Sequence, residues 1–220
     1  MPRQLQINIF YMTNNVHIAL NEQYEAPVIK ESNRDEWVEY GEDNNYYQWL
    51  IDRYVNSPTN NAVINNINKL IYGKGLSCLD ASKKPSEYAQ MVTLFRPECL
   101  KQIIGDLKML GQCALQVIYN KDRSKIVEVS HVPIQLLRSE KCNEEGEIEG
   151  YYFSNDWTDV KKNPPERFAS FGTSNDNTEI LYIKPYSVGL KYYAYVDYQG
   201  SLPYTILEQE VGNYLINEVQ

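Results

Sequence analysis

The chain has 220 residues, a formal net charge of −8 at pH 7, 43% hydrophobic residues and 23% charged residues. This composition is typical of a globular protein with one core or two lobes, and the acidic balance argues against a basic clamp for nucleic acid. No apolar run approaches the ~20 residues of a membrane helix, and the first residues do not form a signal peptide. We therefore expect no membrane partner.

Residues 1–25 alternate weakly between apolar and polar side chains, which predicts a strand or an extended arm. The turn-like residues 13–15 leave a hairpin open as well, with residues 16–20 as its second strand. An arm that packs on a neighbouring subunit and a hairpin that packs on its own core are both compatible with this pattern.

Residues 26–48 are polar and rich in acidic side chains, which is typical of a solvated loop. We expect Trp37, Tyr40 and Tyr46 to anchor this loop to the core. Residues 1–48 thus form an N-terminal arm or hairpin followed by an acidic loop, and a short helix follows from Tyr46 to Tyr54.

The best-defined element is a helix over residues 57–72. Ser57 is a good N-cap, Pro58 suits the first helical position, and Gly73 suits the C-terminal cap. One helical face carries the apolar residues Val63, Ile64, Ile67, Leu70 and Ile71, which we expect to face the core. The opposite face carries Asn60, Asn61, Asn65, Asn66, Asn68 and Lys69, which we expect at the surface.

Two further helices follow a short connector. Pro85 begins one, with Tyr88, Met91, Val92 and Phe95 at helical spacing, and Pro97 ends it or begins the next. Residues 100–110 then carry the strongest amphipathic stripe of the chain, Leu100, Ile103, Ile104, Leu107 and Leu110.

The period then changes from helix to strand. Residues 113–119, 126–129 and 148–153 read as strands separated by turns, which predicts an antiparallel meander behind the preceding helix. We therefore expect an α+β fold, in which amphipathic helices pack on an antiparallel β-sheet. Residues 49–202 form this domain.

The last third of the chain begins with a polar segment, residues 156–178, which predicts a flexible loop or insertion. Residues 179–183 read as a strand, and a tyrosine-rich loop spans residues 186–204. A helix begins near Pro203 and runs to residue 220 without a stop signal, so we expect residues 203–220 to lead into a C-terminal part that is missing here.

The sequence offers no recognisable chemistry. Cys78, Cys99, Cys113 and Cys142 have no zinc-site spacing, and we expect four reduced thiols, with Cys99 and Cys113 packed in the interior. No phosphate-binding loop, nucleophile elbow or positioned carboxylate pair is present, and His131 reads as a core or strand-edge residue. We expect no enzymatic activity, no catalytic residue, no cofactor and no metal.

Several motifs, taken in order, resemble the N-terminal part of tailed-bacteriophage portal proteins. The resemblance rests on W-V-E-Y-G-E-D-N at 37–44, S-P-T-N-N-A-V-I at 57–64 and G-K-G-L at 73–76. It continues with Asp106-Leu107, Gly111 and Tyr119 at a helix-to-strand junction, His131-Val132-Pro133, and Gly150-Tyr151-Tyr152-Phe153.

The resemblance implies a portal wing-like domain and a structural role. Portal subunits form a ring, expected to be a dodecamer, at one capsid vertex, where the terminase large subunit docks and double-stranded DNA passes without sequence specificity. Capsid, head-completion and tail-connector proteins are the other implied partners. The implied location is the virion, and the host cytoplasm during assembly, with a phage or prophage origin left open.

Under this interpretation the subunit surfaces are the functional part. The candidate contact residues lie on the amide face of helix 57–72 and in the tyrosine-rich loop: Asn61, Asn65, Asn68, Lys69, Tyr186, Tyr192, Tyr193 and Tyr195. The alternative is a carbohydrate- or ligand-binding module or a small hydrolase, because rings and carboxylates that stack on and hydrogen-bond sugars are abundant, with 19 tyrosines in the chain. A genomic composition bias would also account for the tyrosines.

Overall fold

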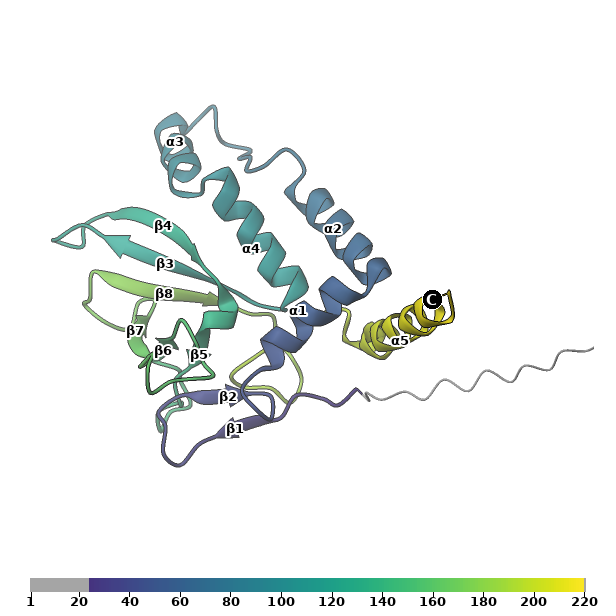
Figure 1. Cartoon of the computed structure of the whole chain (residues 1–220). Coiled ribbons are helices and arrows are strands. Elements are labelled where there is room, and N and C mark those ends of the chain that lie inside the picture. Colours follow the sequence, from purple (N-terminus) through teal and green to yellow (C-terminus); the bar gives the residue numbers. More distant parts are fainter. Residues whose placement is uncertain (1–23, 220) are drawn as a thin grey trace, which may run out of the picture.

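The computed structural model describes residues 24–219. Within this range it shows a mixed α+β fold with five α-helices, a six-stranded sheet and a separate two-stranded hairpin (Figure 1). The expected α+β class is confirmed. The predictions of an arm, or of a hairpin with its turn at residues 13–15, concern residues outside the described part of the chain.

The acidic segment after residue 25 is more ordered than the expected loop. Strands β1 (Ile29–Glu31) and β2 (Val38–Tyr40) pair antiparallel, because Val38 and Tyr40 alternate with the more exposed Glu39 and give β2 one buried face. The expected anchoring holds for Tyr40 and Tyr46, which are both buried. Gly41 then turns the chain with φ of 89°, and a Cβ there would lie 2.9 Å from the Cβ of Tyr46.

All of the predicted helices are present, with bounds close to those expected. Ser57 accepts a hydrogen bond from the Asn60 amide at 3.3 Å, and Gly73 ends the second helix with φ of 50°. The helices are α1 (Tyr46–Asn56), α2 (Pro58–Tyr72), α3 (Pro85–Leu94), α4 (Pro97–Met109) and α5 (Leu202–Val219).

The main sheet has the strand order β4-β3-β8-β7-β6-β5. All neighbouring pairs are antiparallel except β7 and β8, which are parallel at Ala169–Glu179 and Ser170–Ile180. The strands are β3 (Cys113–Tyr119), β4 (Ile126–Val132), β5 (Leu137–Ser139), β6 (Gly150–Phe153), β7 (Glu166–Ser170) and β8 (Thr178–Ile183).

The predicted meander is wrong beyond its first hairpin. The β3–β4 pair is present, but β6 lies on the far side of β8 and β7 and does not pair with β4. Pro133 and a short 3-10 turn at Ile134–Leu136 end β4 and lead the chain to the opposite edge, where β5 pairs with β6. The expected loop at residues 156–178 is also wrong in part, because it contains β7.

Tyrosine rings fill much of the core. Tyr40 stacks on Tyr193 with 4.3 Å between ring centroids, and Tyr47 packs edge-on against Tyr40. Tyr192 and Tyr193 belong to this core, so the prediction that the loop at residues 186–204 presents its rings at the surface is wrong for both. The hydroxyl of Tyr40 donates to the Ala194 carbonyl at 3.0 Å, which secures this segment inside the fold.

The helices form a layer beside the sheet. Helix α4 packs against β3 and β4, and α2 packs on α4 (Figure 1). Because α2 is one layer farther from the sheet, only Asn60 and Ile64 are buried along it. The expected orientation of its apolar stripe toward the core is therefore wrong for Val63, Leu70 and Ile71, which are exposed. The expected surface position is wrong for Asn60, which is buried.

Candidate functional site

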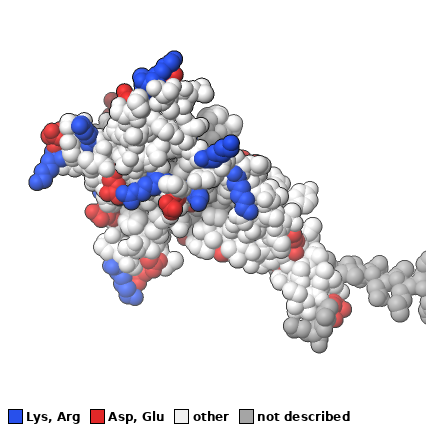
Figure 2. All heavy atoms as spheres, turned by 90° about the horizontal axis from the view of Figure 1, so that it is seen from above, with Lys and Arg blue, Asp and Glu red and all other residues white. Residues whose placement is uncertain are grey.

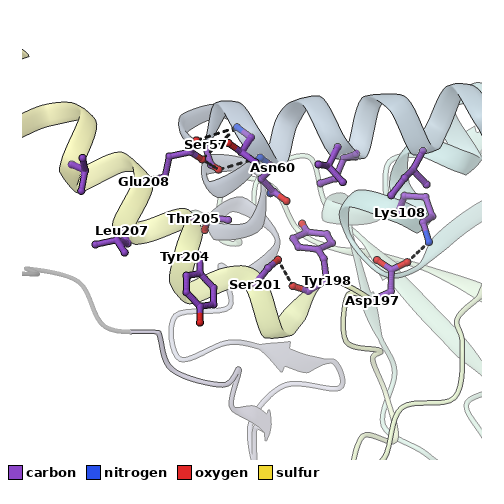
Figure 3. Close-up of a pocket in the computed structure, with 15 residues that line it drawn as sticks. Ser57, Asn60, Lys108, Asp197, Tyr198, Ser201, Tyr204, Thr205, Leu207 and Glu208 are labelled. Carbon is purple, nitrogen blue, oxygen red and sulfur yellow. Dashed lines mark hydrogen bonds and ion pairs between the residues drawn. The ribbon is translucent and has the colours of Figure 1, made fainter. Parts of the chain in front are cut away.

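A groove with a volume of about 590 Å³ lies between α2 and α5 (Figure 3). Most of its wall is apolar. The side chains that line it include Val63, Ile64 and Ile67 from α2 and Tyr204, Leu207 and Val211 from α5. Concave surfaces with apolar walls and a few polar groups at the rim are typical of binding sites.

One end of the groove is closed by a contact between the two helices. The carboxylate of Glu208 accepts a hydrogen bond from the Thr59 hydroxyl at 2.6 Å and from the Thr59 amide at 3.3 Å. It also accepts one from the hydroxyl of Ser57. These donors surround the N-terminus of α2, where the helix dipole favours a negative charge. The hydrogen bond from Ser57, followed by that from Thr59, lowers the pKa of the Glu208 carboxyl.

The other end of the groove carries polar groups from two segments. Lys108 of α4 forms an ion pair with Asp197 (Figure 3). The hydroxyl of Tyr198 donates to the Met109 carbonyl at 2.8 Å. Burial raises the pKa of Tyr198, so the ring keeps its proton and its hydrogen bond at neutral pH. These contacts fix the segment that leads into α5.

Apolar side chains continue from the groove onto the open surface of both helices. Val63 is 50% exposed and Leu70 is 81% exposed on α2, while Leu207, Leu215 and Ile216 are exposed on α5. We call this set, with the groove, the α2–α5 apolar surface. An apolar groove with exposed apolar side chains on both of its helices marks a contact site for another chain more often than scattered single residues do.

The amide face of α2 is used within the chain itself. The side-chain amide of Asn65 donates to Asn61 at 2.8 Å, and the hydroxyl of Tyr54 on α1 donates to the Asn65 carbonyl oxygen at 2.9 Å. Asn61 in turn donates to the Tyr54 backbone carbonyl at 3.3 Å. Asn61 and Asn65 are therefore half-buried and join α2 to α1.

The remaining candidate contact residues are scattered. Asn68 is half-buried and Lys69 is exposed on α2, while Tyr186 is 89% exposed. Tyr195 is half-buried, and its neighbours Tyr192 and Tyr193 are buried. The structure thus brings together Asn61 and Asn65 but does not place them beside the tyrosines. Contact of any of these residues with another subunit stays a prediction.

Sequence reasoning missed the residues of the α2–α5 apolar surface as a site. The sequence did contain a signal for an apolar surface. The stripe on α2 has five large apolar residues, which is more than a helix in the second layer can bury against its neighbours. Glu208 could not be found in this way, since its role depends on the spatial meeting of two helices that are about 150 residues apart, as Thr59 and Glu208 are.

His131 is a strand-edge histidine, as expected. It lies on β4, the edge strand of the sheet, and its Nε2 is 2.7 Å from Oδ2 of Asp106 on α4. The same carboxylate oxygen accepts a hydrogen bond from the Ile134 amide at 3.2 Å. The pair therefore joins α4 to the end of β4. Among residues 24–219, no group of three or more His, Cys, Asp or Glu side chains could hold a metal ion.

A comparison of the sequence with protein-family models finds no match, and a search of curated proteins finds no significant match. In the described part of the chain, no helix is both long enough and apolar enough to span a bilayer.

Proposed function

We propose that this chain is a structural subunit of a tailed-bacteriophage portal ring, the passage for DNA at the unique capsid vertex. The observation that carries the proposal is the α2–α5 apolar surface, with a groove of about 590 Å³ between the two helices and Leu70 81% exposed on α2. A surface of this kind needs a partner, and in a closed ring each subunit buries one face against the next.

The order of the motifs supports the same proposal. The segment 37–44 spans β2 and the turn into α1, the segment 57–64 begins α2, and the segment 73–76 follows its end. Asp106 to Gly111 forms the junction from α4 to β3. The helix layer beside a mostly antiparallel sheet is also compatible with a portal wing-like domain.

The distribution of charge fits a chain that lets DNA pass without holding it. On the face shown in Figure 2, Lys and Arg side chains are interspersed with Asp and Glu, and no single basic patch covers that face. The net charge is −8. Tight binding of phosphates would need clustered cations and would slow sliding. We propose that the DNA contact is non-specific, and that the terminase large subunit, capsid proteins and tail connectors bind other faces of the ring.

The observations favour the alternative of a sugar-binding module or small hydrolase less than they favour the ring. It depended on rings at the surface, whereas Tyr40, Tyr47, Tyr151 and Tyr193 lie in the core. Tyr204 lines the α2–α5 groove with Asp197 and Glu208, but both carboxylates are engaged within the chain, Asp197 by Lys108 and Glu208 by Ser57 and Thr59. We therefore develop the ring proposal alone.

The test is the assembly state of the purified full-length protein that carries these 220 residues. Sedimentation velocity over a concentration series should show a species of about twelve subunits, and negative-stain images of that species should show rings with a central hole. A full-length protein that stays monomeric up to its solubility limit would contradict the proposal. Closed dimers without rings would also contradict it.

A further inference from the structure

The α2–α5 groove has room for an occupant that the described residues do not supply. Its volume is about 590 Å³, which is within the range of sites that hold a small ligand or a few side chains. The residues that line it run from Ser57 to Ile67 on the α2 side and from Ser201 to Val211 on the α5 side. Each wall therefore follows about 15 Å of helix.

The charged groups at the groove are already engaged within the chain. Of the residues that line it, Lys108 forms an ion pair with Asp197. Glu208, the remaining charged residue of the lining, accepts hydrogen bonds from Ser57 and Thr59. A charged group brought into the groove would lose water and gain no unpaired counter-charge from the lining, which is unfavourable. The groove therefore favours an uncharged, apolar occupant.

The chain contains a segment with these properties outside the described residues. Residues 4–21 include no Lys, Arg, Asp or Glu, and they form the longest such run of the sequence. Within this run, Leu5, Ile7 and Ile9 alternate with amide side chains. In an extended chain the three apolar side chains share one side and the amides share the other, which suits a groove with one open side. Five extended residues span about 13 Å, close to the length of the groove walls.

The described chain begins close to the groove. The ring of Tyr24 packs on Trp49 of α1 with 5.8 Å between centroids, and α1 packs on both α2 and α5. From Trp49, α1 leads over about 12 Å to Ser57 at the end of the groove. The chain from residue 9 to residue 24 can span up to about 50 Å, so residues 5–9 can reach the groove of their own chain.

This attachment makes binding within one chain easier than binding between chains. A segment tethered over a short distance has an effective concentration on the order of 1 mM at its site. A weak intrinsic affinity is therefore enough to fill the groove from the same chain. A neighbouring copy would need a protein concentration of the same order to compete.

We propose that residues 5–9 bind in extended form in the α2–α5 groove of their own chain, with Leu5, Ile7 and Ile9 against its apolar walls. The contact lies within one chain, so it goes beyond the ring proposal and does not need a ring. Its effect on assembly rests on the proposed function, because a neighbouring subunit that uses the groove must displace the segment. Residues 5–9 are then a tethered competitor for the surface through which the ring closes.

Disulfide formation between introduced cysteines tests this contact in the full-length protein. Val63 is a half-exposed residue of the α2 wall, and Ile7→Cys with Val63→Cys places one thiol on the segment and one in the groove. Gln6→Cys with Val63→Cys is the matched control, because residue 6 lies on the opposite side of an extended chain. Under a mild oxidant, mass spectrometry should find the first pair joined severalfold faster than the control pair. Equal rates would overturn the proposal.

Isotope labelling separates binding within one chain from binding between copies. Equal amounts of labelled and unlabelled protein with Ile7→Cys and Val63→Cys are mixed before oxidation. We expect each joined pair of peptides to be wholly labelled or wholly unlabelled. Pairs with one labelled and one unlabelled peptide would place the segment on a neighbouring copy and overturn the proposal. This result is read in monomers and rings alike, so its failure is distinct from a failure of the ring proposal in sedimentation velocity.

A charge in the groove should release the segment. Val63→Glu should slow the joining of Ile7→Cys to Leu207→Cys, on the α5 wall, severalfold. Val127→Glu makes the same change at a valine of similar exposure on β4 and should leave that rate unchanged. An unchanged rate in Val63→Glu that circular dichroism shows to be folded would overturn the proposal. If Val63→Glu does not fold, the comparison of Ile7→Cys with Gln6→Cys decides the question alone.

Discussion

Glu208 on α5 caps the N-terminus of α2 through Thr59, with 2.6 Å between the carboxylate and the hydroxyl oxygen. The two residues belong to helices at opposite ends of the described chain. Their contact fixes one end of the α2–α5 groove, so the shape of this surface depends on a hydrogen-bonded charge as well as on packing.

Replacing the carboxylate should weaken this contact. Glu208→Gln removes the negative charge from the helix N-terminus, and we expect the free energy of unfolding to fall by about 0.5 kcal/mol at pH 7, at the low end of the usual range because the site is half-exposed. Urea denaturation followed by circular dichroism measures this change. Glu210→Gln makes the same charge change on the same helix and is the matched control.

The contribution of Glu208 should also depend on pH. Its folded-state pKa is lowered from the ordinary value of 4.5, so the stabilisation is fully present above that value and is lost as the pH falls through the lowered pKa. The difference in unfolding free energy between the unaltered chain and Glu208→Gln should shrink as the pH is lowered from 7 to 3. If the difference in unfolding free energy stayed constant from pH 7 to pH 3, the charge of Glu208 would not contribute to stability.

The exposed part of α2 offers a direct test of assembly. Leu70→Glu places a charge at a position that is 81% exposed, and we expect it to abolish ring formation in sedimentation velocity while changing the unfolding free energy by less than about 0.5 kcal/mol. Leu79→Glu has the same chemistry at a fully exposed site away from the groove, and it should assemble normally. Rings formed by Leu70→Glu would remove this part of α2 from the proposed interface.

The buried hydroxyl of Tyr193 should contribute to the stability of the fold and not to contacts with another subunit. The hydroxyl of Tyr193 donates to the Val38 carbonyl and accepts from the Ser139 amide at 3.2 Å. Tyr193→Phe leaves both backbone groups without their partner, at a cost of about 1–3 kcal/mol in unfolding free energy. Tyr186→Phe, at an exposed ring, should leave the urea midpoint unchanged. A neutral Tyr193→Phe would mean that water can replace the hydroxyl.

Arg138 should be the most sensitive charged position tested. Its buried guanidinium donates to the carbonyls of Gln135, Leu137 and Asn44, and its Cζ lies 4.9 Å from the ring centroid of Trp157. Arg138→Met should lower the unfolding free energy by about 3 kcal/mol or more, because several buried carbonyls lose a charged donor. Arg34→Met, at an exposed site, is the control. A thermal unfolding transition of Arg138→Met that calorimetry finds unchanged would show that the hydrogen bonds of Arg138 do not stabilise the fold.

Local signals in the sequence located the helices well. Ser57, Pro58 and Gly73 act on their own turns, so the bounds of α2 follow from neighbouring residues alone. Periodicity also separated its apolar from its amide side chains. It could not say which side meets the rest of the chain, because Asn61 and Asn65 find their partner in Tyr54 of α1.

The strand order of the sheet could not be predicted from the sequence, for a different reason. Strand β7 is short and lies in a polar segment, and its parallel pairing with β8 depends on contacts that no local pattern encodes. The burial of Tyr192 and Tyr193 could not be predicted for the same reason, since a tyrosine is found both in cores and at surfaces. The candidate site was missed because it lies between helices that only the fold brings together.

The parallel pair of β7 and β8 divides the main sheet into two antiparallel halves, β4-β3-β8 and β7-β6-β5. Few ladder hydrogen bonds cross that line, since the register includes only Ala169–Glu179 and Ser170–Ile180. The stacked rings of Tyr151 on β6 and Tyr182 on β8, with centroids 4.6 Å apart, add a side-chain contact across that line. The two halves should behave as separate foldons in amide hydrogen exchange, coupled by an aromatic contact.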